Sequence, residues 1–106
     1  MRKTYPLHIE GRHPDRVLDA VKHDIRKYLK RERRRDLPAG ADYWDFDCRF
    51  GLSADAAQST HLGNLITQVD AAAKEGAAAV YVEILARPAL RSKSARPAAA
   101  PDEDGG

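Results

Sequence analysis

The stretch from Pro14 to Arg35 limits the possible folds of this chain more than any other stretch. Its apolar side chains recur at intervals of three and four residues, which places them on one face of an α-helix. They are Val17, Leu18, Val21, Ile25, Tyr28 and Leu29. Pro14 suits the first helical position, because the amide hydrogen that proline lacks would have no partner there. The pattern predicts one long helix over residues 14–35, which Pro38 ends.

The last turns of this predicted helix are basic. The apolar stripe stops at Leu29, but residues compatible with a helix continue to Arg35. The candidate anion contacts are Lys27, Lys30, Arg31, Arg33, Arg34 and Arg35. One interpretation is a solvated helix end, because cations stabilise a helix C-terminus by about 0.3–1 kcal/mol each and can pair with Asp24, Glu32 and Asp36. The other interpretation is a site for an anionic partner, since arginine binds phosphate with two hydrogen bonds.

The segment Tyr43–Gly51 shows the clearest strand alternation in the chain. The side chains expected on its apolar face are Trp44, Phe46, Cys48 and Phe50, and those on its polar face are Asp45, Asp47 and Arg49. The aromatic face needs a core, and the predicted helix is its natural cover. Cys48 is expected to be a small buried hydrophobic residue. Asp45 and Asp47 are expected to be a solvated pair, because no third metal ligand or glycine-rich phosphate loop accompanies them.

A further strand is predicted before the long helix, and a further helix is predicted after the strand Tyr43–Gly51. Residues Thr4–Glu10 alternate between apolar and polar, and Pro6 favours an edge position because it cannot donate to a strand ladder. Residues 60–75 have helical periodicity, with Thr60 as the candidate cap and Gly76 as the stop.

The last predicted strand, Ala79–Arg87, is rich in residues that favour strands. Its core face is expected to hold Val80, Val82 and Ile84. Tyr81 and Leu85 are expected to be exposed on the open face of the sheet, where they form a candidate contact surface for a second copy or another protein.

The order strand, helix, strand, helix, strand predicts an α+β fold of the two-layer α/β sandwich type. A three-stranded sheet would carry both helices on one face, and right-handed crossovers favour parallel pairing in the order 1-2-3. The alternative is a ferredoxin-like relative with a further short strand near Gly51–Asp55, which would give antiparallel pairs. Residues 1–91 are expected to form a single domain. Residues 92–106 are expected to be a disordered tail, because their Ser, Ala, Pro, Asp and Gly show no apolar periodicity.

Composition and motif content narrow the classes of function. The formal net charge is +2, so the positive charge is local to the basic helix end. The single cysteine excludes an internal disulfide, and no apolar run is long enough for a signal peptide or a membrane span, so a cytoplasmic location away from membranes is expected. The four histidines have no metal-site spacing, and no metal or cofactor is expected. An enzyme is the least favoured class, because no nucleophile stands with a base.

Three segments carry a resemblance to a known family. KYLKRERRR (Lys27–Arg35), LPAGADYWDFDCRFG (Leu37–Gly51) and YVEILARP (Tyr81–Pro88) resemble segments of a small family of uncharacterised bacterial proteins, described only as a domain of unknown function. The resemblance covers roughly residues 3–91. It implies a small cytoplasmic bacterial protein, and it brings no activity, substrate or catalytic residue.

Two functional hypotheses follow from the residues. The first is a small interaction protein whose basic helix end contacts an anionic partner, with nucleic acid or a ribonucleoprotein as the first candidate and an acidic protein as another. Binding to nucleic acid would weaken steeply with salt, because it is driven by counterion release. The alternative is a protein-interaction or self-associating module, a monomer or weak homodimer, that uses Tyr81 and Leu85. In that case the basic run is only a solvated helix end.

Overall fold

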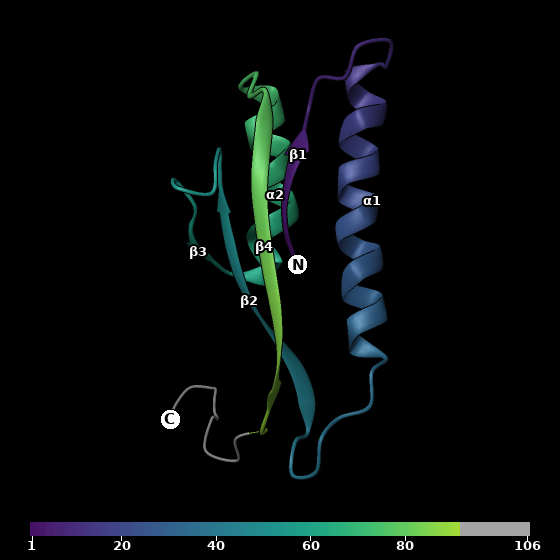
Figure 1. Ribbon diagram of the computed structural model, residues 1–106, viewed down its shortest axis with the longest axis vertical. Helices are drawn as coiled ribbons and strands as arrows, with labels where there is room; N and C mark the ends of the chain where they lie inside the picture. Colours follow the sequence, from purple (N-terminus) through teal and green to yellow (C-terminus); the bar gives the residue numbers. More distant parts are fainter. Residues whose placement is uncertain (92–106) are drawn as a thin grey trace.

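The computed structural model describes residues 1–91 of the 106-residue chain, so the predicted disorder of residues 92–106 lies outside the described residues. The elements are β1 (Arg2–Pro6), α1 (Pro14–Arg33), β2 (Tyr43–Gly51), β3 (Gln58–Thr60), α2 (Leu62–Lys74) and β4 (Ala79–Ala89). The four strands form one open antiparallel sheet in the order β1-β4-β2-β3. Figure 1 shows β4 in the middle of this sheet, with α1 beside β1.

The α+β architecture with two helices is confirmed, but the predicted sheet is wrong in two respects. The sheet has four strands instead of three, and its pairing is antiparallel, as the ferredoxin-like alternative expected, instead of parallel in the order 1-2-3. The short strand β3 begins at Gln58, after the Gly51–Asp55 position that the ferredoxin-like alternative gave it, and the structure does not confirm a ferredoxin-like arrangement. A strand of three residues is too short to show a period of two, which is why the sequence did not reveal it.

Strand β4 is longer than predicted and organises the sheet. It continues to Ala89 instead of ending before Pro88, and it pairs with β2 from Tyr81 to Ala89. The backbone N–H of Ile84 donates to the carbonyl of Met1, so the backbone N–H and C=O groups of even-numbered β4 residues point toward β1. Because β1 extends only as far as the level of Ile84, the hydrogen that Pro88 lacks would face an open edge, where proline is tolerated.

The core lies between one face of the sheet and the two helices. Strand residues Phe46, Cys48, Val80, Val82 and Ile84 pack in one cluster with helix residues Val21, Ile25, Leu65 and Val69. Both helices therefore cover the same face, as the sequence predicts. Cys48 is only 4% exposed, which confirms it as a buried hydrophobic residue, and burial raises its pKa to about 11.

Both helices begin with a histidine cap. The Nδ1 atom of His13 accepts from the backbone N–H of Asp15 at 3.2 Å, and Nδ1 of His61 accepts from Gly63 at 3.3 Å. The prediction that Thr60 caps the second helix is wrong, because its hydroxyl donates to the side chain of Gln68 instead. Helix α1 ends at Arg33, two residues before the predicted end.

Candidate anion-binding site

The last turns of α1 project basic side chains away from the core. Between Arg26 and Arg35 the chain has seven basic residues and one acidic residue. Tyr28 and Leu29 pack against the core cluster and fix the rotation of this part of the helix. Lys30 and Arg34, one turn apart, lie on the side opposite the buried residue Val21.

Two of the six predicted contacts have an acidic neighbour. Nη1 of Arg35 lies 2.6 Å from the carboxylate of Glu32, and Nε of Arg31 lies 3.9 Å from it. The carboxylate of Asp24 is not part of this group, because it accepts from the hydroxyl of Tyr5 at 2.5 Å and lies near Lys3. The solvated-helix interpretation therefore fits Arg31 and Arg35, which share one carboxylate.

The other four predicted contacts form a group that we call the basic patch, and its members are Lys27, Lys30, Arg33 and Arg34. Within residues 1–91, no carboxylate oxygen lies within 4 Å of a side-chain nitrogen of any of these four residues. Three of them line an open hollow of about 460 Å³ on the surface of α1, together with Arg26 and Leu29. Like charges this close repel one another, so an anion that enters the hollow would be attracted by all of them.

Aromatic rings lie beneath the arginines at this end of the molecule. The guanidinium of Arg33 lies 5.5 Å from the ring centre of Phe46, and that of Arg35 lies 5.0 Å from Trp44. The indole N–H of Trp44 also donates to the backbone carbonyl of Arg35 at 2.9 Å. The sequence placed Trp44 only in the core. Its contact with the helix end depends on where β2 starts below α1, which no local pattern shows.

The two predicted protein contacts on the open sheet face do not have the expected exposure. Tyr81 is only 8% exposed, so the expectation that it lies open to solvent is wrong, and Leu85 is half-buried. The cause is the segment after β2. The backbone of Ala57 lies so close to Gly51, the neighbour of Tyr81 in the sheet, that an added Cβ would come within 2.7 Å of it. This segment therefore covers the outer face beside Tyr81.

Besides Tyr81 and Leu85, that outer face carries paired charges. Glu83 is buried and lies 3.4 Å from Nε of Arg2 and 3.9 Å from Nη1 of Arg49, and it also accepts from the hydroxyl of Tyr81. Asp45 and Asp47 both accept from the guanidinium of Arg87, at 2.8 and 2.9 Å. Their neutralising neighbour is therefore Arg87, which lies on β4, the strand paired with β2.

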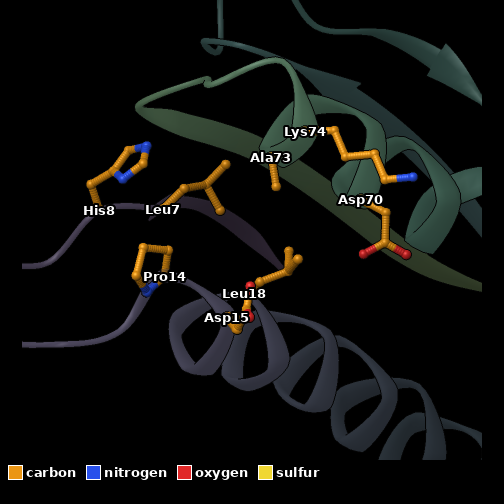
Figure 2. A pocket seen from close by; sticks show the side chains of 8 residues that line it. All are labelled: Leu7, His8, Pro14, Asp15, Leu18, Asp70, Ala73 and Lys74. Carbon is orange, nitrogen blue, oxygen red and sulfur yellow. The ribbon is translucent and has the colours of Figure 1, made fainter.

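A further hollow lies where β1, the start of α1 and the end of α2 meet. It has a volume of about 340 Å³, and Figure 2 shows Leu7, Leu18 and Ala73 around it, with His8 at one side. None of the eight residues that line it carries a hydroxyl or a thiol. Asp70, at its edge, is held by Lys22 of α1 at 2.8 Å. This hollow therefore offers no hydroxyl or thiol nucleophile, and one of its acids is already paired.

Residues 1–91 offer neither a metal-binding cluster nor a helix that could cross a membrane. No group of three or more His, Cys, Asp and Glu side chains there is arranged to hold a metal ion. In the same part of the chain, no helix combines the length and the apolar character that crossing a membrane requires.

Comparison with known proteins gives a family and no activity. No curated protein and no solved structure matches the chain. One family model, described as a family of unknown function (DUF6172), matches residues 1–95, which include every element of the fold and the whole basic patch. The resemblance to an uncharacterised family is thereby confirmed, and the chain belongs to the family of unknown function DUF6172.

Proposed function

We propose that this protein binds nucleic acid through the phosphate backbone, with the basic patch on α1 as the contact surface. The observation that carries the proposal is a set of four cations, Lys27, Lys30, Arg33 and Arg34, that are exposed at the end of α1 and form no ion pair with a carboxylate of residues 1–91. Lysine and arginine contacts to phosphate supply most of the affinity of binding that does not depend on base sequence.

The dimensions of the patch suit a phosphate backbone. Lys27 and Arg34 are seven residues apart, which is about 10 Å along a helix. Phosphates of one B-DNA strand follow one another every 3.4 Å or so along the duplex axis, so the patch spans roughly three of them. A rigid helix holds its side chains at fixed intervals, and the ordering cost on binding is limited to the side chains themselves.

The surroundings of the patch favour a duplex over a single strand. Single-strand binders stack bases on aromatic rings. Here the rings of Tyr28, Phe46 and Trp44 lie under Arg31, Arg33 and Arg35, so the guanidinium groups lie over their faces. We therefore expect a double helix bound by its phosphates, with little preference for sequence.

The test is a binding titration of a short labelled DNA duplex, a single strand of the same sequence and mixed RNA. Lys27, Lys30, Arg33 and Arg34 are all changed to Gln in the test variant. Four phosphate contacts predict that affinity for the duplex falls about 100-fold between about 50 and 200 mM salt. The variant should lose at least about tenfold at the lower salt concentration.

The control variant removes the same charge elsewhere on the surface. Its changed residues are Arg12, Arg16, Lys74 and Arg91, all to Gln, and all four are exposed. If the two variants bind the duplex equally well, the interaction reflects only net charge, and the basic patch is not the site. If the wild type does not bind any of the three probes at low salt, the proposal is wrong.

A further inference from the structure

The free edge of β1 and the neighbouring face of α1 form a groove that shares only Lys27 with the basic patch. Strand β1 is at the edge of the sheet and pairs only with β4. The amide of Leu7 donates to Ala78, and the amide of Ile84 donates to Met1. Odd-numbered residues of β1 therefore bond to β4. The N–H and C=O groups of Arg2 and Thr4 point the other way, toward open space.

The floor of this groove is apolar in its first part. A hollow of about 310 Å³ lies between the β1 edge and α1, and the residues that line it include Tyr5, Ile9, Val17, Ala20 and Val21. The α1 members are spaced at three and four residues, so they present one face of the helix to the strand edge. Ile9 is 38% exposed, so apolar surface is open to a ligand here.

The second part of the groove is basic. A neighbouring hollow of about 350 Å³ shares Lys3 and Asp24 with the first one and continues to Lys27 and Arg31. Asp24 is the only acid in the lining of either hollow. Its carboxylate already accepts from Tyr5 and lies 3.7 Å from Nζ of Lys3. The lining of the two hollows therefore holds an excess of positive charge over this one acid, and its apolar residues gather in the first hollow. The cations are Lys3, Arg12, Lys27 and Arg31.

We propose that this groove binds an extended peptide segment of a partner protein, which adds to the sheet as a fifth strand beside β1. Edge strands next to a helix groove bind peptides in this way, with main-chain hydrogen bonds supplying affinity and side-chain pockets supplying selectivity. The partner segment carries an apolar residue over Val17 and Ala20 and acidic residues beside Lys27 and Arg31. The charge of the lining selects an acidic segment over a basic one.

The geometry limits the length of the added strand. Pro6 has no N–H to offer, and beyond it the chain leaves the sheet. The pairing groups of the edge are therefore those of Arg2 and Thr4 and the carbonyl of Pro6. A segment of about five residues covers this length at roughly 3.4 Å per residue.

The test uses a synthetic peptide, acetyl-Val-Thr-Val-Thr-Glu-Asp-Glu-amide, together with its reversed sequence, because either strand direction can pair. Binding to the full chain is followed by NMR. We expect the peptide to change the chemical shifts of the Thr4 amide and of the methyl groups of Val17 and Val21. A matched peptide with Lys in place of the three acids should bind at least tenfold more weakly. An acidic peptide with N-methyl groups at alternate residues should also lose at least tenfold.

A protein variant separates this groove from the rest of the surface. Ala20 is exposed and lines the groove, so Ala20→Glu places bulk and negative charge there without entering the core. It should weaken the acidic peptide at least tenfold, whereas Ala20→Gln, which adds bulk without charge, should have a smaller effect. Binding of a DNA duplex should be unchanged by Ala20→Gln, so failure of one proposal is distinguishable from failure of the other.

Three results would overturn the proposal. Main-chain pairing does not depend on side chains, so any extended peptide should pair with β1 at a high enough concentration. The absence of chemical-shift changes along β1 at millimolar peptide would therefore exclude the added strand. Equal binding of the acidic and the Lys peptides would remove the basis for the stated partner. Dimerisation of the protein that Ala20→Glu abolishes would show that the occupant is a second copy of the chain.

Discussion

Two surfaces of this protein are rich in charge, and they differ in how the charge is arranged. On the outer sheet face, arginines alternate with acids and the structure pairs them, as Arg87 does with Asp45 and Asp47. On the basic patch, Lys27, Lys30, Arg33 and Arg34 have no acidic partner among the residues that the structure describes. The charges of the first surface are neutralised within the molecule, whereas those of the second would be neutralised by an anionic partner.

The difference follows from secondary structure. Neighbouring strands bring residues that are distant in sequence within reach of each other, so opposite charges from β2 and β4 can meet. On the exposed side of a helix, away from other elements, the neighbours of a side chain are three or four residues away. A helix segment whose local sequence holds seven basic residues and one acid cannot pair them internally. Charge on a strand is therefore a weaker indication of a binding site than the same charge on a helix.

The largest effect should come from the centre of the paired surface. Glu83→Ala leaves the buried hydroxyl of Tyr81 without its acceptor and removes the partner of Arg2 and Arg49. We expect a loss of about 2 kcal/mol in the free energy of unfolding, measured by urea titration. Glu83→Gln keeps an acceptor for Tyr81 and should cost less. A loss below about 0.5 kcal/mol for Glu83→Ala would mean that this face is ordinary surface.

The next effect concerns pH and the same group of residues. The hydrogen bond to Glu83, and then burial, raise the pKa of Tyr81 above its ordinary value of 10.0. Above pH 10 the unfolded chain therefore loses this proton while the folded chain keeps it, so stability falls as pH rises. Tyr81→Phe removes this contribution, and the stability difference between wild type and variant should shrink between about pH 9 and pH 11. A difference that stays constant over this range would contradict the hydrogen bond.

The outer face also shows what sequence could and could not predict. The alternation over Tyr43–Gly51 gave the bounds of β2 correctly, because a period of two is a local property. The periodicity of α1 gave the helix to within two residues. The pairing of Tyr5 with Val80, which places β4 between β1 and β2, joins residues far apart in the sequence, and no local pattern contains it. Periodicity therefore could not predict the strand order.

The same distinction applies to the candidate sites. The six basic positions could be found from sequence, because a run of charge and the end of an apolar stripe are both local. The burial of Tyr81 could not be found, because it depends on the close approach of Ala57 to Gly51. The groove beside β1 was missed as well. It depends on which edge of the strand is left open, and only the sheet order decides that.

A smaller effect is expected at the exposed end of the paired surface. Arg87 is half exposed and bonds two carboxylates that are themselves exposed by 41% and 61%. Arg87→Gln should lower the free energy of unfolding by about 0.5–1 kcal/mol at low salt, and by less at high salt, because exposed ion pairs are weak and screened. Urea titrations at the two salt concentrations measure both values. If the loss does not change with salt, packing of the arginine stem explains it instead of the ion pairs.

The smallest effect on stability is expected at the basic patch, and it completes the contrast. Lys30 and Arg34 are like charges one helical turn apart, which costs about 0.2–0.5 kcal/mol, whereas each cation near a helix C-terminus gains about 0.3–1 kcal/mol. Because these contributions oppose each other, Lys30→Gln with Arg34→Gln should change the free energy of unfolding by less than about 0.5 kcal/mol. The same double variant should bind a DNA duplex more weakly than wild type. A large loss of stability would show that these side chains stabilise the fold. The claim that the charges of the basic patch are free for a partner would then be wrong.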